Sequence, residues 1–313
     1  MKAKVHPQVE QVLQALAKAN LAPFETLTPD QARAQMEAMV KARNVALPPL
    51  GGIENRRIPA PHGEIPIRIY RPIKPQTSGA VLYFHGGGHV IGSLDTHEAV
   101  ASALCAKSGT VFVSIDYRMG PEHKFPAAVD DSFTALNWVA ANAAELRIDA
   151  AKLAVAGDSA GGNLAAVVAL LARDAGQPAL RLQVLAYPVA DYRLMDPSYN
   201  TYAQGYGPLS DKAMAWFKRH YLRDAADADD WHASPVLAAS HKSVAPAMVL
   251  TAECDVLHDE GVRLARALSN AGVRVDHQDY AGIIHGFLGM APAVDAAVEA
   301  QDRIARALVE ALS

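Results

Sequence analysis

One pentapeptide, Gly157-Asp158-Ser159-Ala160-Gly161, limits what this chain can fold into more than any other segment. It follows a short apolar run, 153–156, and precedes a segment, 161–174, whose apolar residues recur every three or four positions. This order predicts a buried strand, a sharp turn and a helix. Such a turn holds its serine in a strained conformation above the sheet, and the glycines two residues to either side avoid collisions with neighbouring backbone.

The setting of Ser159 predicts a nucleophile. A helix that begins at this serine offers free N–H groups and the positive end of its dipole to negative charge that develops nearby. A Gly-x-Ser-x-Gly sequence without such flanks is equally consistent with a flexible loop. The strand and the helix on either side of this one favour the nucleophile.

The rest of the chain supports the same kind of fold. From Ile65 onward, short β-rich runs alternate with longer helical patterns, which predicts a mainly parallel sheet with helices on both faces. We expect strands at 65–70, 80–84, 111–115, 153–156, 182–187, 247–252 and 273–280, and helices at 96–107, 127–144, 161–174, 260–271 and 294–312.

Two regions, 1–48 and 189–232, fall outside this alternation. We interpret them as the two parts of a helical cap over an α/β core formed by 49–188 and 233–313. Several large side chains in these regions would either line a pocket or pack as core, and helical spacing makes packing the default. They are Met36, Met39, Tyr192, Met195, Tyr206, Met214, Trp216 and Phe217.

A second motif, His85-Gly86-Gly87-Gly88, follows the expected strand 80–84. Its backbone N–H groups carry no side-chain obstruction, so those of Gly87 and Gly88, with that of Ala160, are the predicted oxyanion hole. A plain glycine-rich turn is the alternative, whereas a phosphate loop of the Walker type needs a Gly-Lys-Ser/Thr ending that is absent from this run. His85 precedes the nucleophile and is expected to fix the loop.

The acid and the base should follow the nucleophile in the order serine, acid, histidine. Asp255 closes the expected strand 247–252 and is favoured as the acid over Asp259 and Glu260, which sit where a helix begins and are explained as capping residues. His285 follows the next expected strand and is the predicted base. The competing histidines are His277, which falls within that strand, and His258, which belongs to the acid loop.

Composition excludes several other classes. The 313 residues carry a net charge of −4 with scattered Lys and Arg, so nucleic acid is not an expected partner. No run of about 18 apolar residues predicts a membrane span, and the N-terminus has no uninterrupted apolar core for a signal peptide. Cys105 and Cys254 are too few for a disulfide framework or a four-thiolate zinc site, and the histidines show no metal-ligand spacing. We therefore expect a cytoplasmic protein without a metal or cofactor.

The motifs resemble those of the hormone-sensitive lipase family of bacterial esterases, the α/β-hydrolases that carry Gly-Asp-Ser-Ala-Gly. Besides the two glycine motifs, the resemblance rests on Asp116-Tyr117-Arg118, on Pro121 to Ala128, and on the sequences around Asp255 and His285. It implies an eight-stranded mixed sheet, a helical cap formed partly by the N-terminus, and hydrolysis of short-chain acyl esters. It also implies a possible homodimer.

One position departs from that family. His89 follows the glycine run where the family commonly has an aromatic residue, so the shape of the pocket is in question, and a histidine there could titrate near the substrate. We take His89, Asp158, Tyr187 and Phe217 as candidate substrate contacts.

Two stretches are expected to be structural. Tyr117, Arg118, Glu122 and Phe125 lie beside a buried strand, where an arginine and a glutamate usually form a supporting ion pair.

Taken together, the predicted nucleophile, acid, base and oxyanion hole make a carboxylesterase for short- to medium-chain acyl esters the leading hypothesis. A ligand receptor with this fold and an amidase or peptidase with the same triad are the alternatives.

Overall fold

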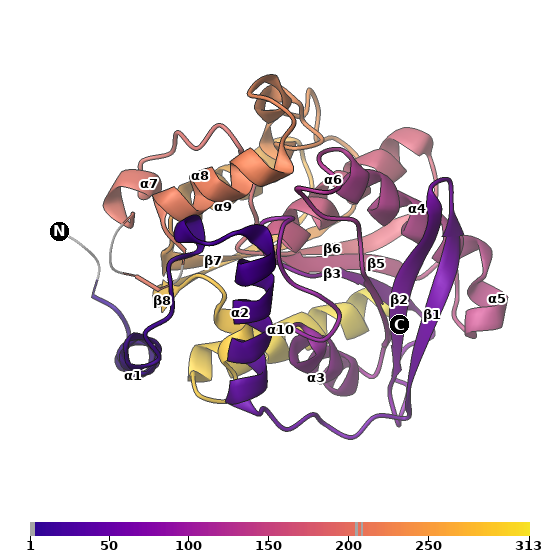
Figure 1. Ribbon diagram of the computed structural model, residues 1–313. Coiled ribbons are helices and arrows are strands. Elements are labelled where there is room, and N and C mark those ends of the chain that lie inside the picture. Colours follow the sequence, from indigo (N-terminus) through magenta and orange to yellow (C-terminus); the bar gives the residue numbers. More distant parts are fainter. Residues whose placement is uncertain (1–3, 204–205, 208) are drawn as a thin grey trace.

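The computed structural model describes residues 4–203, 206–207 and 209–313, and it contains one eight-stranded sheet with helices on both faces (Figure 1). The strand order is β1-β2-β4-β3-β5-β6-β7-β8; β2 is antiparallel to both neighbours and all later pairs are parallel. The strands are β1 (Gly52–Ala60), β2 (Gly63–Arg71), β3 (Ala80–Phe84), β4 (Val111–Ile115), β5 (Leu153–Asp158), β6 (Leu180–Ala186), β7 (Ala247–Cys254) and β8 (Val275–Ile284). The predicted mostly parallel sheet is confirmed.

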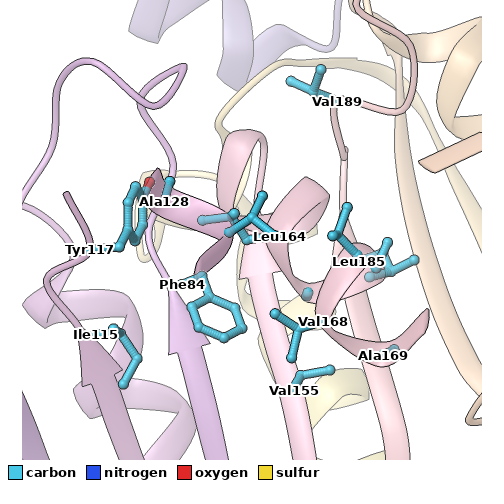
Figure 2. Close-up of a cluster of buried hydrophobic side chains, with 14 of the residues drawn as sticks. Phe84, Ile115, Tyr117, Ala128, Val155, Leu164, Val168, Ala169, Leu185 and Val189 are labelled. Carbon is cyan, nitrogen blue, oxygen red and sulfur yellow. The ribbon is translucent and has the colours of Figure 1, made fainter. Parts of the chain in front are cut away.

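Residue alternation along the strands gives the sheet two apolar faces. Leu82 and Phe84 of β3 pack in one core, whereas Val81 and Tyr83 pack in the other. The first core lies against α4 (Ala127–Ala141), α6 (Ala160–Ala175) and α9 (His258–Asn270), and the second against α3 (Glu98–Ser108) and α10 (Asp295–Leu312). Figure 2 shows the first core, where Phe84 and Val155 lie against Leu164 and Val168 of α6.

Sequence analysis missed β1 and misplaced some helix ends. The β1 strand is an edge strand in which exposed and partly buried residues alternate, and it contains Glu54, Arg56 and Pro59. Charges and proline are common on edge strands and hide the apolar pattern of a strand. The expected helix 127–144 is also divided, because α4 ends before Asn142 and α5 (Ala143–Leu146) follows.

The helices outside the core come from two distant parts of the chain. α1 (Pro7–Lys18), η1 (Phe24–Thr26) and α2 (Pro29–Arg43) form the N-terminal part; α7 (Ser198–Thr201), α8 (Asp211–Tyr221) and η2 (Ala226–Asp229) form the second part. The two parts touch: the Phe24 and Phe217 rings are 6.0 Å apart, and the Trp216 indole N–H donates to Leu27 O at 3.2 Å. These contacts agree with a shared cap, although its boundaries remain a prediction.

Two further short helices complete the fold, η3 (Pro235–Leu237) and η4 (Phe287–Met290). Among the helices in the described part of the chain, none has the length and apolar character needed to cross a membrane.

Candidate active site

Ser159 sits on a strained turn between β5 and α6. Its backbone has φ 56° and ψ −119°, a region that residues with a side chain rarely adopt, while its N–H donates to Ala186 O at 2.8 Å. The flanking glycines are needed for close backbone contact, since a Cβ on Gly157 would lie 2.2 Å from Gly161 O and one on Gly161 would lie 1.9 Å from Phe84 O. The strain is therefore held by the packing of the strand ends.

The sheet register brings the predicted acid and base to the same edge. Cys254 of β7 pairs with Ile284 of β8, so the next residues, Asp255 and His285, leave neighbouring strands side by side. The His285 Nδ1–H donates to Asp255 Oδ2 at 2.6 Å, and Nε2 lies 2.9 Å from Ser159 Oγ. Asp255 is only 2% exposed, and its other oxygen accepts the Leu257 N–H at 3.0 Å.

The competing acids are engaged elsewhere. Asp259 pairs with His258 and accepts the Ser198 N–H, and the fully buried Glu260 accepts the N–H groups of Ala190 and Asp191. None of these contacts involves Ser159 or His285.

The competing bases also have other partners. His277 lies in β8 beside the Thr251 hydroxyl, at 3.0 Å. Hydrogen bonds to Asp279 and Asp259 outweigh burial and raise the pKa of His258 to about 9. A histidine that stays protonated at neutral pH is a poor general base.

The glycine loop after β3 is held against the turn that carries Ser159. Phe84 pairs with Gly157 in the sheet, and the Gly86 N–H donates to Asp158 Oδ1 at 3.1 Å. Gly87 and Gly88 have φ +117° and +61°, and a Cβ on Gly88 would lie 2.3 Å from the Phe217 ring. Only glycine satisfies both the backbone angles and this contact. Ala160 begins α6 immediately after Ser159, so its N–H is at the free end of the helix.

Asp158 and His85 fix this loop through hydrogen bonds to the backbone of Gly86. Asp158 Oδ1 also accepts the Tyr83 hydroxyl at 2.7 Å, and His97 Nε2 lies 3.7 Å from Oδ2. Burial alone would raise the pKa of Asp158, but His97 and the Tyr83 hydroxyl outweigh it and the pKa is lowered. Burial lowers the pKa of His85 to about 3, so it is neutral, and its Nδ1–H donates to Gly86 O at 2.8 Å.

A cavity of about 170 Å³ opens over Ser159. Its wall combines the predicted catalytic residues with apolar side chains of the cap, and it includes Met36, Met39, Met214, Phe217 and Tyr187. The Tyr187 ring meets the His285 ring edge-on at 4.9 Å. Larger hollows of about 490 and 540 Å³ contain none of the predicted catalytic residues. The second of them adjoins this cavity, since Leu16, Phe24 and Met39 line both.

Four of the large side chains considered from the sequence do not line this cavity. Trp216 and Tyr192 are buried in the core, Met195 is 80% exposed, and Tyr206 packs against the Tyr202 ring at 5.6 Å. The helical pattern alone did not separate them from the residues that reach the cavity.

His89 lies behind the glycine loop rather than in the cavity wall. It is fully buried, its ring stacks on Tyr221 at 3.9 Å, and its Nδ1 lies 2.7 Å from the Tyr192 hydroxyl. Burial, with a smaller effect from His85, lowers the pKa of His89 to about 3. The structure therefore places a neutral histidine in the packing beneath the second cap part, where it does not titrate beside a substrate.

The expected ion pair between Arg118 and Glu122 is wrong. Arg118 binds both carboxylate oxygens of Asp131, whereas Glu122 binds Arg33 of α2. Arg33 and Glu122 are 89 residues apart, so no local sequence signal could have paired them. Sequence analysis also missed His97, which lines the cavity beside Asp158.

Comparison with known proteins agrees with this fold. The family described as the alpha/beta hydrolase fold matches residues 81–289. The chain belongs to the α/β-hydrolase family. An ethyl acetate hydrolase from Pseudomonas putida is 41% identical to this α/β-hydrolase over 252 residues, 79% of each chain. An arylesterase from Saccharolobus solfataricus is 37% identical over 283 residues, 90% of this chain and 92% of the arylesterase.

Solved structures show the same relationship. A thermostable esterase from Pseudomonas putida superposes on this α/β-hydrolase with a TM-score of 0.94 and 38% identity, covering 99% of this chain and 98% of the esterase. The resemblance to the hormone-sensitive lipase group, drawn from the sequence motifs, is confirmed.

Proposed function

We propose that this protein is a carboxylesterase that uses Ser159, His285 and Asp255 to hydrolyse short- to medium-chain acyl esters. The observation that carries the proposal is the continuous chain of contacts from Ser159 Oγ to His285 Nε2 at 2.9 Å and from His285 Nδ1 to Asp255 at 2.6 Å. This is the arrangement in which a histidine can take the proton of a serine while an aspartate holds its tautomer. The names of the relatives, an ethyl acetate hydrolase and an arylesterase, support the proposed esterase activity.

The reaction proceeds in two halves. His285 takes the Ser159 proton as Oγ attacks the ester carbonyl, and the N–H groups of Gly87, Gly88 and Ala160 bind the oxyanion. His285 then returns the proton to the alkoxide leaving group, so an alcohol departs and the acyl group stays on Ser159. Water, deprotonated by His285, attacks the acyl-enzyme; the carboxylic acid leaves and Ser159 regains its proton.

The cavity supports the preference for small esters. A volume of about 170 Å³ is small for a ligand pocket. Its cap wall is formed by methionine and aromatic side chains, which favour an apolar acyl or alcohol group. An ethyl acetate hydrolase among the relatives points to the same size range.

The test is replacement of Ser159 by Ala. Purified wild-type protein should hydrolyse p-nitrophenyl acetate and butyrate faster than the octanoate, and a fluorophosphonate should label the peptide that contains Ser159. The variant should lose both the label and the turnover, retaining at most the roughly 10³- to 10⁴-fold acceleration over water that binding and an oxyanion hole alone provide. Unchanged turnover in the variant would exclude Ser159 as the nucleophile.

Two alternatives have their own readouts. Comparable kcat/KM on a matched anilide and ester would favour an amidase. Tight ligand binding without turnover across an ester panel would favour a receptor. A homodimer and a cytoplasmic location stay predictions, and sedimentation velocity tests the first of them.

A further inference from the structure

Arg43, the last residue of α2, is a cation in the wall of the cavity that contains Ser159 and His285. Among the described residues its side chain has one hydrogen bond, and that bond is weak: Nη1 donates to Gly289 O at 3.3 Å. Gly289 belongs to the short helix η4 that follows His285, so the guanidinium rests on the segment that leads away from the predicted base. The side chain remains exposed and can reorient toward a bound molecule.

The charge of Arg43 has no carboxylate partner within the described part of the chain. Burial by the cavity walls, despite the exposed face, lowers the pKa of the guanidinium, and no acidic group acts against this shift. An arginine nevertheless stays protonated at neutral pH. Arg33 on the same helix is different, because it pairs with Glu122 through both carboxylate oxygens.

The remaining charge in the described cavity wall does not neutralise Arg43. The other ionised side chain there is Asp158, whose carboxylate is bound by the Tyr83 hydroxyl and the Gly86 N–H beneath the glycine loop. His97 lies beside it at 3.7 Å. Asp158 is thus already engaged, and the cap side of the cavity carries an uncompensated positive charge.

The helix arranges Arg43 at the end of an apolar stripe. Met36, Met39, Val40 and Arg43 all line the cavity, and their spacing of three, four and seven residues places them on one face of α2. At a rise of about 1.5 Å per residue, this stripe extends for roughly 10 Å. A substrate that follows the apolar stripe from Met36 would therefore meet the guanidinium at its end.

We infer that the cavity accepts esters that carry a carboxylate, with Arg43 as the residue that binds this second group. The inference rests on the proposed esterase function and adds the class of substrate. An apolar chain of a few carbons between the scissile ester and the carboxylate fits the methionine-lined stripe, and the guanidinium offers the carboxylate two parallel N–H donors. Arg43 determines specificity and takes no part in bond cleavage.

The test compares charged and neutral esters of the same shape. On the acyl side, 4-nitrophenyl hydrogen adipate is compared with its methyl ester; on the alcohol side, 4-acetoxybenzoate is compared with its methyl ester. The ratio of kcat/KM for the charged and neutral member is measured for wild type, Arg43→Gln and Arg43→Glu. Lys41→Gln is the matched control, because Lys41 is an exposed cation near the same helix end that does not line the cavity.

We expect Arg43→Gln to lower the charged-to-neutral ratio by roughly three- to tenfold in at least one of the two series, the range for a partly exposed charge-assisted pair. Arg43→Glu should lower that ratio further, and added salt should lower it in wild type but not in Arg43→Gln. Lys41→Gln should leave the ratio unchanged. Turnover of the neutral esters should persist in all variants.

Two results would overturn the inference. One is a ratio unchanged by Arg43→Gln in both series; the other is an equal fall in Arg43→Gln and Lys41→Gln, which would indicate general surface charge. Either would leave Arg43 as a helix-terminal cation that bonds to Gly289 O. Absence of neutral ester hydrolysis in wild type would instead refute the esterase proposal. Equal melting temperatures would establish that the variants are folded.

Discussion

Replacing Arg33 by Ala should weaken the attachment of α2 to the core, because this one side chain joins the helix to two separate loops. Its Nε donates to Val90 O at 2.9 Å and its Nη2 to Gly120 O at 2.8 Å. Its Nη1 and Nη2 also bind Glu122 at 2.9 and 2.6 Å. Val90 belongs to the loop that follows the predicted oxyanion donors.

The expected loss of stability follows from the carbonyl oxygens that Arg33→Ala leaves without a hydrogen-bond donor. Val90 and Gly120 are buried, and a buried acceptor that loses its donor costs about 1 to 3 kcal/mol. Since Arg33 is 24% exposed, water can replace part of these bonds, so we expect Arg33→Ala to lower the free energy of unfolding by roughly 3 kcal/mol. Glu122→Gln keeps the bonds to both carbonyls and should cost about 1 kcal/mol.

The ion pair between Arg33 and Glu122 makes the free energy of unfolding depend on pH. Hydrogen bonding to Arg33 lowers the pKa of Glu122 from 4.5 to about 2. The stabilisation is therefore present above the ordinary pKa and is lost as the pH falls toward the lowered one. A shift of this size corresponds to about 3.4 kcal/mol without screening, but half of the Glu122 side chain is exposed and roughly 1 kcal/mol is the expected value.

Urea unfolding of wild type, Arg33→Ala, Glu122→Gln and the double variant at about pH 6 and about pH 3 measures both effects. The coupling energy should be about 1 kcal/mol near pH 6 and should shrink near pH 3. Arg33→Ala should also raise KM for p-nitrophenyl butyrate, since α2 carries Met36 and Met39 of the cavity wall. If Arg33→Ala costs no more than Glu122→Gln, the two carbonyl bonds do not anchor the helix and the reasoning fails.

Three further substitutions test the site itself. Asp255→Asn should lower kcat for p-nitrophenyl butyrate by about 10⁴-fold, because an amide no longer fixes the His285 tautomer; stopped-flow or steady-state rates would show it. Gly88→Ala should lower kcat at least about 10²-fold, since its Cβ would lie 2.3 Å from the Phe217 ring, whereas Gly176→Ala, with φ +73° and nothing within 4 Å, should keep full activity. Tyr83→Phe removes a hydroxyl that donates to Asp158 at 2.7 Å, so urea unfolding should report a loss of about 1 to 3 kcal/mol.

Side chains of the predicted cap contact loops at the edge of the sheet. Arg33 anchors its N-terminal part, and Phe24 contacts Phe217 of α8. Phe217 in turn fills the space next to Gly88. We therefore expect changes in the predicted cap to alter the shape of the loop that carries the predicted oxyanion donors.

Local sequence was sufficient to predict those parts of the structure that are determined by residues close together in the chain. The turn at Ser159 was predictable because glycine spacing, a preceding apolar run and a following helical pattern lie within about twenty residues. The strands β3 and β4 were predicted at their observed bounds, since both are short, mostly apolar runs that are buried on two faces. The chain order of serine, acid and histidine directed the search to Asp255 and His285.

Tertiary structure decided everything that depends on which distant segments meet. The contact of His285 with Asp255 follows from the pairing of β7 with β8, and the partner of Arg33 lies 89 residues away. The helix pattern of α8 did not separate Phe217, which lines the cavity, from Trp216, which is buried in the core beside Leu27. Periodicity predicts that a helix has a buried face, but the segments packed against that face determine which side chains reach the substrate.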